Sequence, residues 1–557
     1  MESNRANLHS RRRFLESSAK GAAAIASLPL VGAANASAAA PAPRVAPFEL
    51  DEITAGALQD SMKSGKETAR SIAEKYLARI KEIDQAQQGA MPAAGPAINS
   101  VIELNPDALA VADQLDRERQ AKGPRGPMHG IPVLIKDNIA THDHMMTTAG
   151  SLALLGSIPP HDSFVAVKLR AAGAVILGKT NLSEWANIRS SHSTSGWSGR
   201  GGLTRNPYAL DRNPCGSSSG SGAAVAANLC AVAVGTETDG SVVCPSSANG
   251  IVGIKPTVGL ISRARIIPIS HSQDTAGPMA RTVTDAVILL GALAGPDNQD
   301  PATAAGNGKS YGDYTQFLDP KGLAGARIGV PRKGFGMNEA VDKLFSGALD
   351  AMKSQGATIV DPAEIDTIDK MGEPEFTVFL YELKADLNAY LAALGPGAPV
   401  HSLDEIIAFN EKHSEREMPW FGQDIFIKSQ AKGDLSNKEY LDAAQQAHLL
   451  ARAQGIDAVM DKNHLDALVA PTAGPSWLTD LIDGDHDTGG SSTPAAVAGY
   501  PNINVPMGFI FGMPVGISFF GRAWSEPVLI KLAYAFEQAT HHRRAPQFLA
   551  TADLSGA

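Results

Sequence analysis

The stretch that decides the fold reads Cys-Gly-Ser-Ser-Ser-Gly-Ser-Gly over residues 215–222, followed by an Ala-rich segment over 223–234 and by Gly-Thr-Glu-Thr-Asp-Gly-Ser-Val over 235–242. Two tight loops rich in small residues thus enclose one apolar run. Glycine permits the backbone conformations that such turns need, and the amides of such loops can bind an anion. The first loop lacks the lysine of a P-loop, so it is not a nucleotide-phosphate site.

A third stretch, Gly-Ile-Pro-Val-Leu-Ile-Lys-Asp-Asn over residues 130–138, ends an apolar run on a lysine. Taken alone, Lys136 is typical of a surface cation at the end of a strand, and the loop over 215–222 could equally be a flexible linker. The three stretches therefore have to be weighed together.

Strand-like and helix-like patterns alternate around these stretches. Apolar runs over 131–135 and 174–177 flank a predicted helix over 163–172, whose N-terminus Asp162 marks. This spacing predicts a right-handed parallel crossover and an α/β fold. Further segments are two amphipathic helices over about 48–82, a largely helical stretch over 374–454, strands over 467–470 and 515–519, and a helix over 526–540.

Apolar strands occur on both sides of the helical stretch, so we interpret residues 370–455 as an insertion into one sheet. We predict a single large domain over 41–545 and a C-terminal tail over 546–557. The 557 residues are 44% hydrophobic and 19% charged, which suits a globular protein. The formal net charge of −10 leaves no basic excess to attract nucleic acid or a membrane surface, so neither is expected as a partner.

The first forty residues differ from the rest. The segment Ser-Arg-Arg-Arg-Phe-Leu-Glu over residues 10–16 resembles a twin-arginine export signal, a Gly/Ala-rich stretch follows over 21–34, and A-x-A cleavage sites occur at 34–36 and 36–38. A disordered Ala-rich tail is the alternative, but it has no need of paired arginines. We expect a signal peptide over 1–40, the Tat translocase as a partner during export, and a bacterial protein in the periplasm or outside the cell.

Taken together, the three stretches resemble the amidase signature family, whose core is a G-G-S-S-G-G-S loop, an Ala-rich helix and a T-D-x-G-G-S loop. Ser217 and Ser241 stand 24 residues apart, as the two catalytic serines of the family do. The resemblance extends over about residues 50–540 and is closest to bacterial peptide amidases, which release ammonia from C-terminal peptide amides. The other matching segments are 178–185, 253–259, 272–279, 498–501 and 505–508.

The resemblance implies a single α/β domain with a mixed, mostly parallel central sheet covered by helices. It also implies that Ser241 is the nucleophile, Ser217 a bridging serine on a cis peptide bond, and Lys136 the base. A serine hydroxyl attacks well only when a neighbour takes its proton, and a lysine can do so only as the neutral amine. Burial can lower a lysine pKa from about 10.4 to near 7. Asp137 would then have to point away from Lys136, because its charge would favour the ammonium form.

By the same resemblance, the amides of Thr238, Asp239 and Gly240 form the oxyanion hole. Glu237 stands where the family usually has aspartate, and Asp239 where many members have glycine. Four further residues are expected to support the site or contact the substrate: Ser218, Ser219, Asp137 and Asp274. The chemistry implied is release of ammonia through an acyl-enzyme, with a small-molecule or peptide amide as substrate and with no metal or other cofactor.

Several other functions fit the sequence less well. A metal hydrolase could use His142-Asp143-His144 or residues 483–487, but neither has a metalloprotease or calcium-loop spacing. Cys215 and Cys244 could be thiol nucleophiles, although we interpret them as packed core cysteines; with Cys230 they allow at most one disulfide. A broad aliphatic or aryl amidase is the main alternative within the family. The amidase component of a glutamyl-tRNA amidotransferase does not fit the leader, and an exported amide-binding protein would not need Lys136, Ser217 and Ser241 intact.

Overall fold

The computed structural model describes residues 45–85, 97–333, 338–487 and 489–554. The chain divides into two units, residues 1–41 and 42–557. The first unit, which contains the expected export signal, lies outside the described residues, as do residues 555–557 of the expected tail. All of the described helices and strands belong to the second unit.

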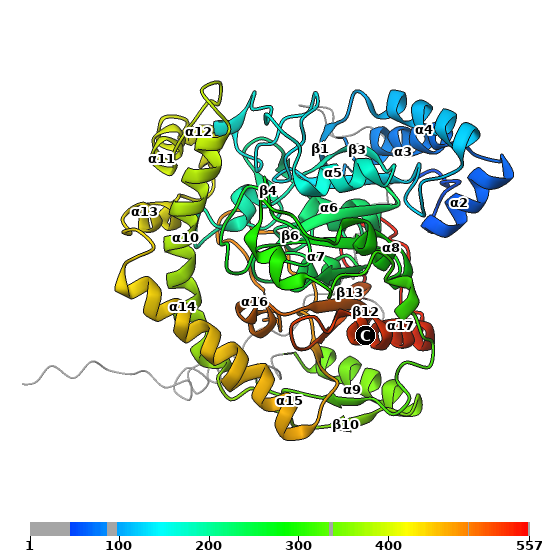
Figure 1. The fold of residues 1–557 in the computed structure, drawn as a ribbon, viewed down its shortest axis with the longest axis vertical. Helices are drawn as coiled ribbons and strands as arrows, with labels where there is room; N and C mark the ends of the chain where they lie inside the picture. Colours follow the sequence, from blue (N-terminus) through cyan, green and yellow to red (C-terminus); the bar gives the residue numbers. More distant parts are fainter. Residues whose placement is uncertain (1–44, 86–96, 334–337, 488, 555–557) are drawn as a thin grey trace, which may run out of the picture. The chain divides into compact units, whose positions relative to one another are not determined.

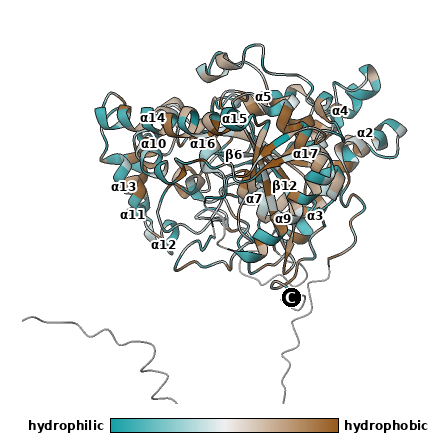
Figure 2. Ribbon diagram, turned by 90° about the horizontal axis from the view of Figure 1, so that it is seen from below, coloured by the Kyte–Doolittle hydropathy of each residue, from teal (hydrophilic) through white to brown (hydrophobic). Residues whose placement is uncertain are grey.

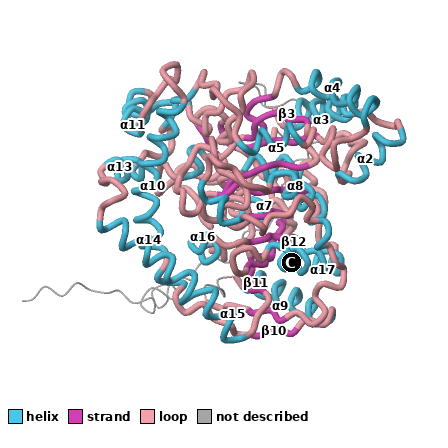
Figure 3. The backbone as a smooth tube through the Cα atoms, in the orientation of Figure 1, coloured by secondary structure: helices cyan, strands magenta, loops and turns pink. Residues whose placement is uncertain are grey.

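An eleven-stranded mixed sheet runs through the second unit (Figure 3). Its strands lie in the order β1-β3-β2-β6-β8-β7-β12-β13-β11-β9-β10. Their bounds are β1 Val101–Leu104, β2 Pro132–Lys136, β3 Val175–Thr180, β6 Val232–Glu237, β7 Val252–Lys255, β8 Thr275–Ala280, β9 Arg327–Gly329, β10 Thr358–Val360, β11 Ala467–Pro471, β12 Asn502–Ile510 and β13 Met513–Phe520.

The expected mixed sheet is confirmed, but its centre is antiparallel. Parallel pairs join β3, β2 and β6 towards one end of the sheet and β11, β9 and β10 at the other. The strands from β6 through β8, β7, β12 and β13 to β11 pair antiparallel. One cause is the tight turn at Phe511 and Gly512, where φ is 49° and 76°. Two successive positive φ values suit a two-residue hairpin, which makes β12 and β13 antiparallel neighbours.

The crossover that the sequence predicted is present. The helix α5 (Phe164–Ala171) connects β2 to β3, which pair in parallel. Its N-cap is Ser163 rather than Asp162, because the Ser163 hydroxyl accepts a hydrogen bond from the Ala166 amide. All five residues of β2 are buried, as is typical of a parallel strand covered on both faces.

The Ala-rich segment over 223–234 is only partly helical. Helix α6 spans Ser219–Ala226, so it begins inside the first Ser/Gly-rich loop, and the segment then enters β6 at Val232. Gly220 allows the start of α6 to lie against the backbone of Ser100 and Asn181, where a Cβ atom would collide with both carbonyl groups. Small residues in this segment therefore serve close packing as well as helix formation.

Helices cover both faces of the sheet, whose strands are the apolar centre in Figure 2. Helices α6 and α7 (Val243–Ala248) pack on one face, and α5, α8 (Val283–Leu293) and α17 (Glu526–Thr540) on the other. Helices α2 (Ala55–Ser64) and α3 (Ala69–Ile83) match the two amphipathic helices expected near the start, and α4 (Ala108–Lys122) packs on α3. In the described part of the chain, no helix is long and apolar enough to cross a membrane.

The helical stretch lies between two strands of the same sheet, β10 and β11, as the sequence predicted. Its helices run along one side of the sheet in Figure 1, where they are yellow-green to orange. Their bounds are α10 Gly372–Ala393, α11 Leu403–Lys412, α12 Ser414–Glu417, α13 Asp424–Gln430, α14 Lys438–Ala451 and α15 Asp457–Asn463. Helix α14 also contacts α16 (Thr493–Ala498), and this contact ties the insertion to the segment before β12.

Candidate active site

The two Ser/Gly-rich loops meet in one cleft of about 390 Å³. Ser217 and Ser241 both line it, together with Thr238, Asp239 and Gly240. The segment over 472–477 and the start of α16 form the other wall. Residues that are 24 positions apart in the chain thus share one cleft, because α6 folds back and β6 returns beside it.

Lys136 is fully buried at the end of β2, directly behind the first serine loop. Its Nζ lies 2.8 Å from Ser217 Oγ, 3.1 Å from Ser218 Oγ and 2.9 Å from Thr236 Oγ1. Burial lowers the pKa of Lys136 to about 7, and this effect outweighs the negative charges of Asp274 and Glu237, which act in the opposite direction. A large share of these amines is therefore neutral near pH 7 and can take a proton from Ser217.

The backbone holds the two serine loops in register. The peptide bond between Gly216 and Ser217 is cis, as the family resemblance implied. The Ser217 carbonyl accepts a hydrogen bond from the Ser183 amide at 3.1 Å, and the Ser241 carbonyl accepts one from the Ser218 amide at 3.2 Å. The second bond joins the two loops directly.

The loop over 238–240 reaches the cleft with its backbone positioned by side chains from a neighbouring segment. The Thr238 hydroxyl donates to Asp274 Oδ1 at 2.6 Å, and the Gln273 amide donates to the Thr238 carbonyl at 3.3 Å. The positive φ of this loop, 79°, falls on Gly240 and not on Asp239, so the non-glycine residue at 239 fits the turn. The amides over 238–240 can therefore face the cleft as an oxyanion hole requires.

Glu237 holds the turn that carries Ser241. Its Oε2 accepts hydrogen bonds from the amides of Val242 and Val243, at 2.7 and 3.0 Å. These two amides follow the serine directly and belong to the start of α7, where unpaired N–H groups need an acceptor. A carboxylate at 237 therefore fixes the backbone on the C-terminal side of Ser241.

The four expected support residues take different places. Ser218 donates to the Thr236 carbonyl and accepts from Lys136, whereas Ser219 donates to the Cys215 carbonyl. Asp274 accepts from Thr238 and from the amides of Ile269 and Ser270, and burial raises its pKa to about 6.

Asp137 points away from Lys136, as a neutral lysine requires. Its Oδ2 accepts hydrogen bonds from Thr148 Oγ1 at 2.5 Å and from Arg200 at 3.3 Å. Burial raises the pKa of Asp137, and the charge of Arg200 opposes this effect. Asp137 thus supports the backbone behind the site and does not contact the serines.

The interpretation of Cys215 and Cys244 as packed core cysteines is wrong, because they form a disulfide whose Cα atoms lie 6.0 Å apart. Cys215 lies two residues before Ser217, and Cys244 three residues after Ser241. Once the serine loops meet, the two cysteines are brought together as well. Cys230 remains a buried free thiol.

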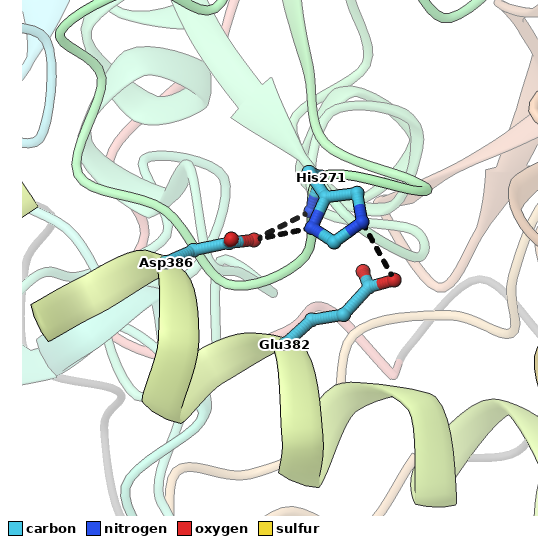
Figure 4. Close-up of side chains that lie close together, drawn as sticks. All are labelled: His271, Glu382 and Asp386. Carbon is cyan, nitrogen blue, oxygen red and sulfur yellow. Dashed lines mark hydrogen bonds and ion pairs between the residues drawn. The ribbon is translucent and has the colours of Figure 1, made fainter. Parts of the chain in front are cut away.

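The helical insertion is anchored beside the oxyanion loop. Figure 4 shows His271, from the loop before β8, between Glu382 and Asp386 of α10. The buried Glu382 accepts hydrogen bonds from the hydroxyls of Ser270 and Ser272, both at 2.5 Å, and from Tyr440 at 2.8 Å. Since Gln273 and Asp274 of the same loop hold Thr238, α10 is connected to the oxyanion loop through one short segment.

The side chains considered as metal ligands have protein partners. Asp143 pairs with Arg170, and His144 with Asp107. In the second group, Asp485 accepts from the amide and hydroxyl of Ser195, so its carboxylate secures this loop at the cleft.

Sequence reasoning missed four contributors to the site. Thr236 and Asn138 complete the polar surroundings of Lys136, with Asn138 Nδ2 donating to Thr236 Oγ1 at 2.9 Å. Gln273 and Glu375 bond to each other beside Thr238. Thr236 and Asn138 lie within the motifs already singled out, so their position offered a signal. Glu375 offered none, because nothing in a helical stretch indicates which of its carboxylates faces a cleft.

A family model described as Amidase matches residues 82–530. The chain belongs to the amidase signature family. A crystal structure of the peptide amidase from Stenotrophomonas maltophilia is 50% identical, has a TM-score of 0.85, and the match covers 90% of this chain and 100% of that one. A probable amidase of Arabidopsis thaliana is 43% identical over 512 residues, which is 90% of this chain and 93% of that protein. The chain is thus an amide-hydrolysing serine enzyme.

More distant members of the family share the fold. The amidase component of the glutamyl-tRNA(Gln) amidotransferase of Microcystis aeruginosa is 34% identical over 519 residues, covering 88% of this chain and 98% of that protein. The crystal structure of the corresponding component from Thermotoga maritima, at 24% identity and a TM-score of 0.65, covers 92% of this chain and 100% of that one. The family as a whole therefore does not identify one substrate.

The disulfide between the two serine loops is expected to stabilise the amidase. It closes a loop over a sequence separation of 29 residues, for which chain entropy predicts about 3 to 4 kcal/mol. Replacing Cys215 and Cys244 together with alanine should lower the urea midpoint of unfolding. Reductant should lower the wild-type midpoint by a similar amount and leave that of the double variant unchanged. A wild-type midpoint that reductant does not move would contradict a stabilising disulfide.

Proposed function

We propose that this amidase is a peptide amidase that hydrolyses the C-terminal carboxamide of peptides. The observation that carries the proposal is the 50% identity to a solved peptide amidase across 90% of this chain, a match that includes the helical insertion. The cleft volume of about 390 Å³ is compatible with the end of a peptide. A broad aliphatic or aryl amidase is the second candidate, and the family membership supports it equally.

The geometry suits a relay of one proton. Ser241 attacks the amide carbonyl while its proton passes to Ser217, and the proton of Ser217 passes to the neutral amine of Lys136, 2.8 Å away. The C–N bond then breaks, the relay returns a proton to the leaving nitrogen, and ammonia departs. Water hydrolyses the acyl-Ser241 ester by the same relay and leaves a carboxylate. The amides over 238–240 stabilise the oxyanion in both steps.

The pH dependence should report the protonation of Lys136. Its pKa is lowered to about 7 by burial, and only the neutral amine can act as the base. We expect kcat/KM to fall about tenfold for each pH unit below 7 and to level off above it. This is measured as initial rates of ammonia release between pH 5 and 8. A flat profile across that range would rule out Lys136 as the base.

Replacement of Ser241 by alanine should abolish ammonia release, because no other hydroxyl can form the acyl-enzyme. The expected loss of kcat exceeds about a thousandfold. Ser191→Ala is the matched control, since Ser191 is exposed and contacts Asp424 rather than the cleft. Retained activity in Ser241→Ala would disprove the mechanism.

The substrate proposal needs three amides, tested with the wild type. We expect ammonia from a dipeptide amide, and little or none from a peptide with a free carboxylate and an internal glutamine or from benzamide. Equal kcat/KM for benzamide and the dipeptide amide would favour the broad amidase instead.

We also propose that the mature enzyme functions in an oxidising compartment after twin-arginine export. The disulfide at the active-site loops supports this, because disulfides persist mainly in periplasmic and extracellular proteins. The paired Arg11 and Arg12 precede the apolar stretch over 21–34.

Export is tested in a bacterium that has a Tat system. The double substitution Arg11→Lys and Arg12→Lys should retain the protein in the cytoplasm, whereas wild type should reach the periplasm or the medium in a shortened form. Lys20→Arg serves as a control outside the arginine pair. Equal export of wild type and the double variant would contradict the proposed leader.

A further inference from the structure

The charged side chains that line the active-site cleft are all acidic. They are Asp239, Asp485 and Asp487, and among the described residues that line the cleft there is no lysine, arginine or histidine. A substrate end that carries a carboxylate would therefore meet negative charge without a cation to pair with it. A neutral carboxamide has no such penalty.

Asp239 is the acidic residue next to the chemistry, two positions before Ser241. Its Oδ2 accepts a hydrogen bond from Thr493 Oγ1 at 2.7 Å. Its Oδ1 is buried, and no N–H or hydroxyl group of the described residues donates to it. A carboxylate oxygen with no donor leaves its negative charge only partly compensated.

A second carboxyl group lies behind Asp239. Glu375 of α10 is only 7% exposed, and its Oε1 accepts a hydrogen bond from Gln273 at 2.8 Å. Burial and the negative charge of Asp239 raise the pKa of Glu375 well above its usual range. Glu375 therefore keeps its proton and shares it with Asp239, while the negative charge of the pair stays on the side of the cleft.

The other two aspartates are less suited to act on the reacting group. Asp485 is held by the amide and hydroxyl of Ser195 and by Asn213. Asp487 is exposed, and its carboxylate accepts from the Gly489 amide. Only Asp239 belongs to the loop that faces the carbonyl carbon attacked by Ser241.

We propose that Asp239 is the specificity-determining residue that separates neutral amide ends from carboxylate ends in this cleft. Hydrolysis turns a neutral amide into a carboxylate at the position closest to Asp239. The same charge that leaves the substrate unaffected thus repels the product and limits product inhibition. The inference rests on the amide hydrolysis of the proposed function and is independent of the preference for peptides.

The test compares two inhibitors of equal size, the peptide acid that is the product and the matching peptide alcohol, which is neutral and is not hydrolysed. Both are measured as competitors of the peptide amide at pH 7.5. In Asp239→Asn we expect the Ki of the acid to fall about tenfold, and the Ki of the alcohol to change less than about twofold. If the wild type hydrolyses benzamide rather than peptide amides, benzoate and benzyl alcohol replace the peptide pair.

Two control variants locate the effect. Glu375→Gln keeps a donor towards Asp239 and removes no net charge from a protonated glutamic acid, so its ratio of the two Ki values should match that of wild type. Asp487→Asn removes an exposed charge from the same cleft and should change the ratio by less than about twofold, because exposed charges are screened.

The proposal is overturned if the acid and the alcohol shift together in Asp239→Asn, or if neither shifts. Should that variant fail to fold, Asp239→Ser and the salt dependence of the wild type decide. Raising the ionic strength should lower the wild-type Ki of the acid and leave that of the alcohol unchanged. A Ki of the acid that does not change with salt contradicts the proposal. Failure of the peptide preference would appear separately, as the absence of peptide amide hydrolysis.

Discussion

The active site depends on the desolvation of Lys136. An ammonium group buried at the end of β2, with hydroxyl and carbonyl groups as its hydrogen-bond partners, has lost its hydration without gaining a paired carboxylate. Its pKa falls to about 7 as a result, and a lysine becomes usable as a base. The surrounding apolar residues of β2 and β3 exclude water, and Asp137 is turned towards Arg200 instead. The core of the sheet and the chemistry are therefore one arrangement.

Everything else in the cleft aligns groups against that lysine. The hydrogen bond between the Ser218 amide and the Ser241 carbonyl, together with the disulfide, joins the two serine loops. Glu237 holds the backbone after Ser241, and Asp274 holds Thr238 before it. Each contact fixes backbone that carries a reacting group or an oxyanion donor, so catalytic geometry does not depend on mobile side chains. The insertion takes part in this, since α10 reaches Thr238 through the loop over 270–274.

Much of the fold could be predicted from local patterns. The apolar run before Lys136 predicted a buried strand, and the alternation around residues 131–177 predicted the parallel crossover, because both depend on period and burial alone. The antiparallel centre of the sheet could not be predicted in this way, since strand direction depends on which distant strands become neighbours. The Ala-rich segment was ambiguous for a related reason: short apolar runs suit a buried helix and a buried strand equally, and α6 and β6 divide it between them.

The sequence by itself determined the residue types, their spacing and the family, and with these the identity of Lys136, Ser217 and Ser241 as residues that act together. Spacing carries this information because the same short loops rebuild the same turns wherever they occur. Only the tertiary structure decided that Cys215 and Cys244 are bonded, that Glu375 lies behind Asp239, and that the cleft is acidic. Those facts depend on the approach of segments far apart in the chain, and the low dielectric constant of the interior then determines which buried groups keep their protons.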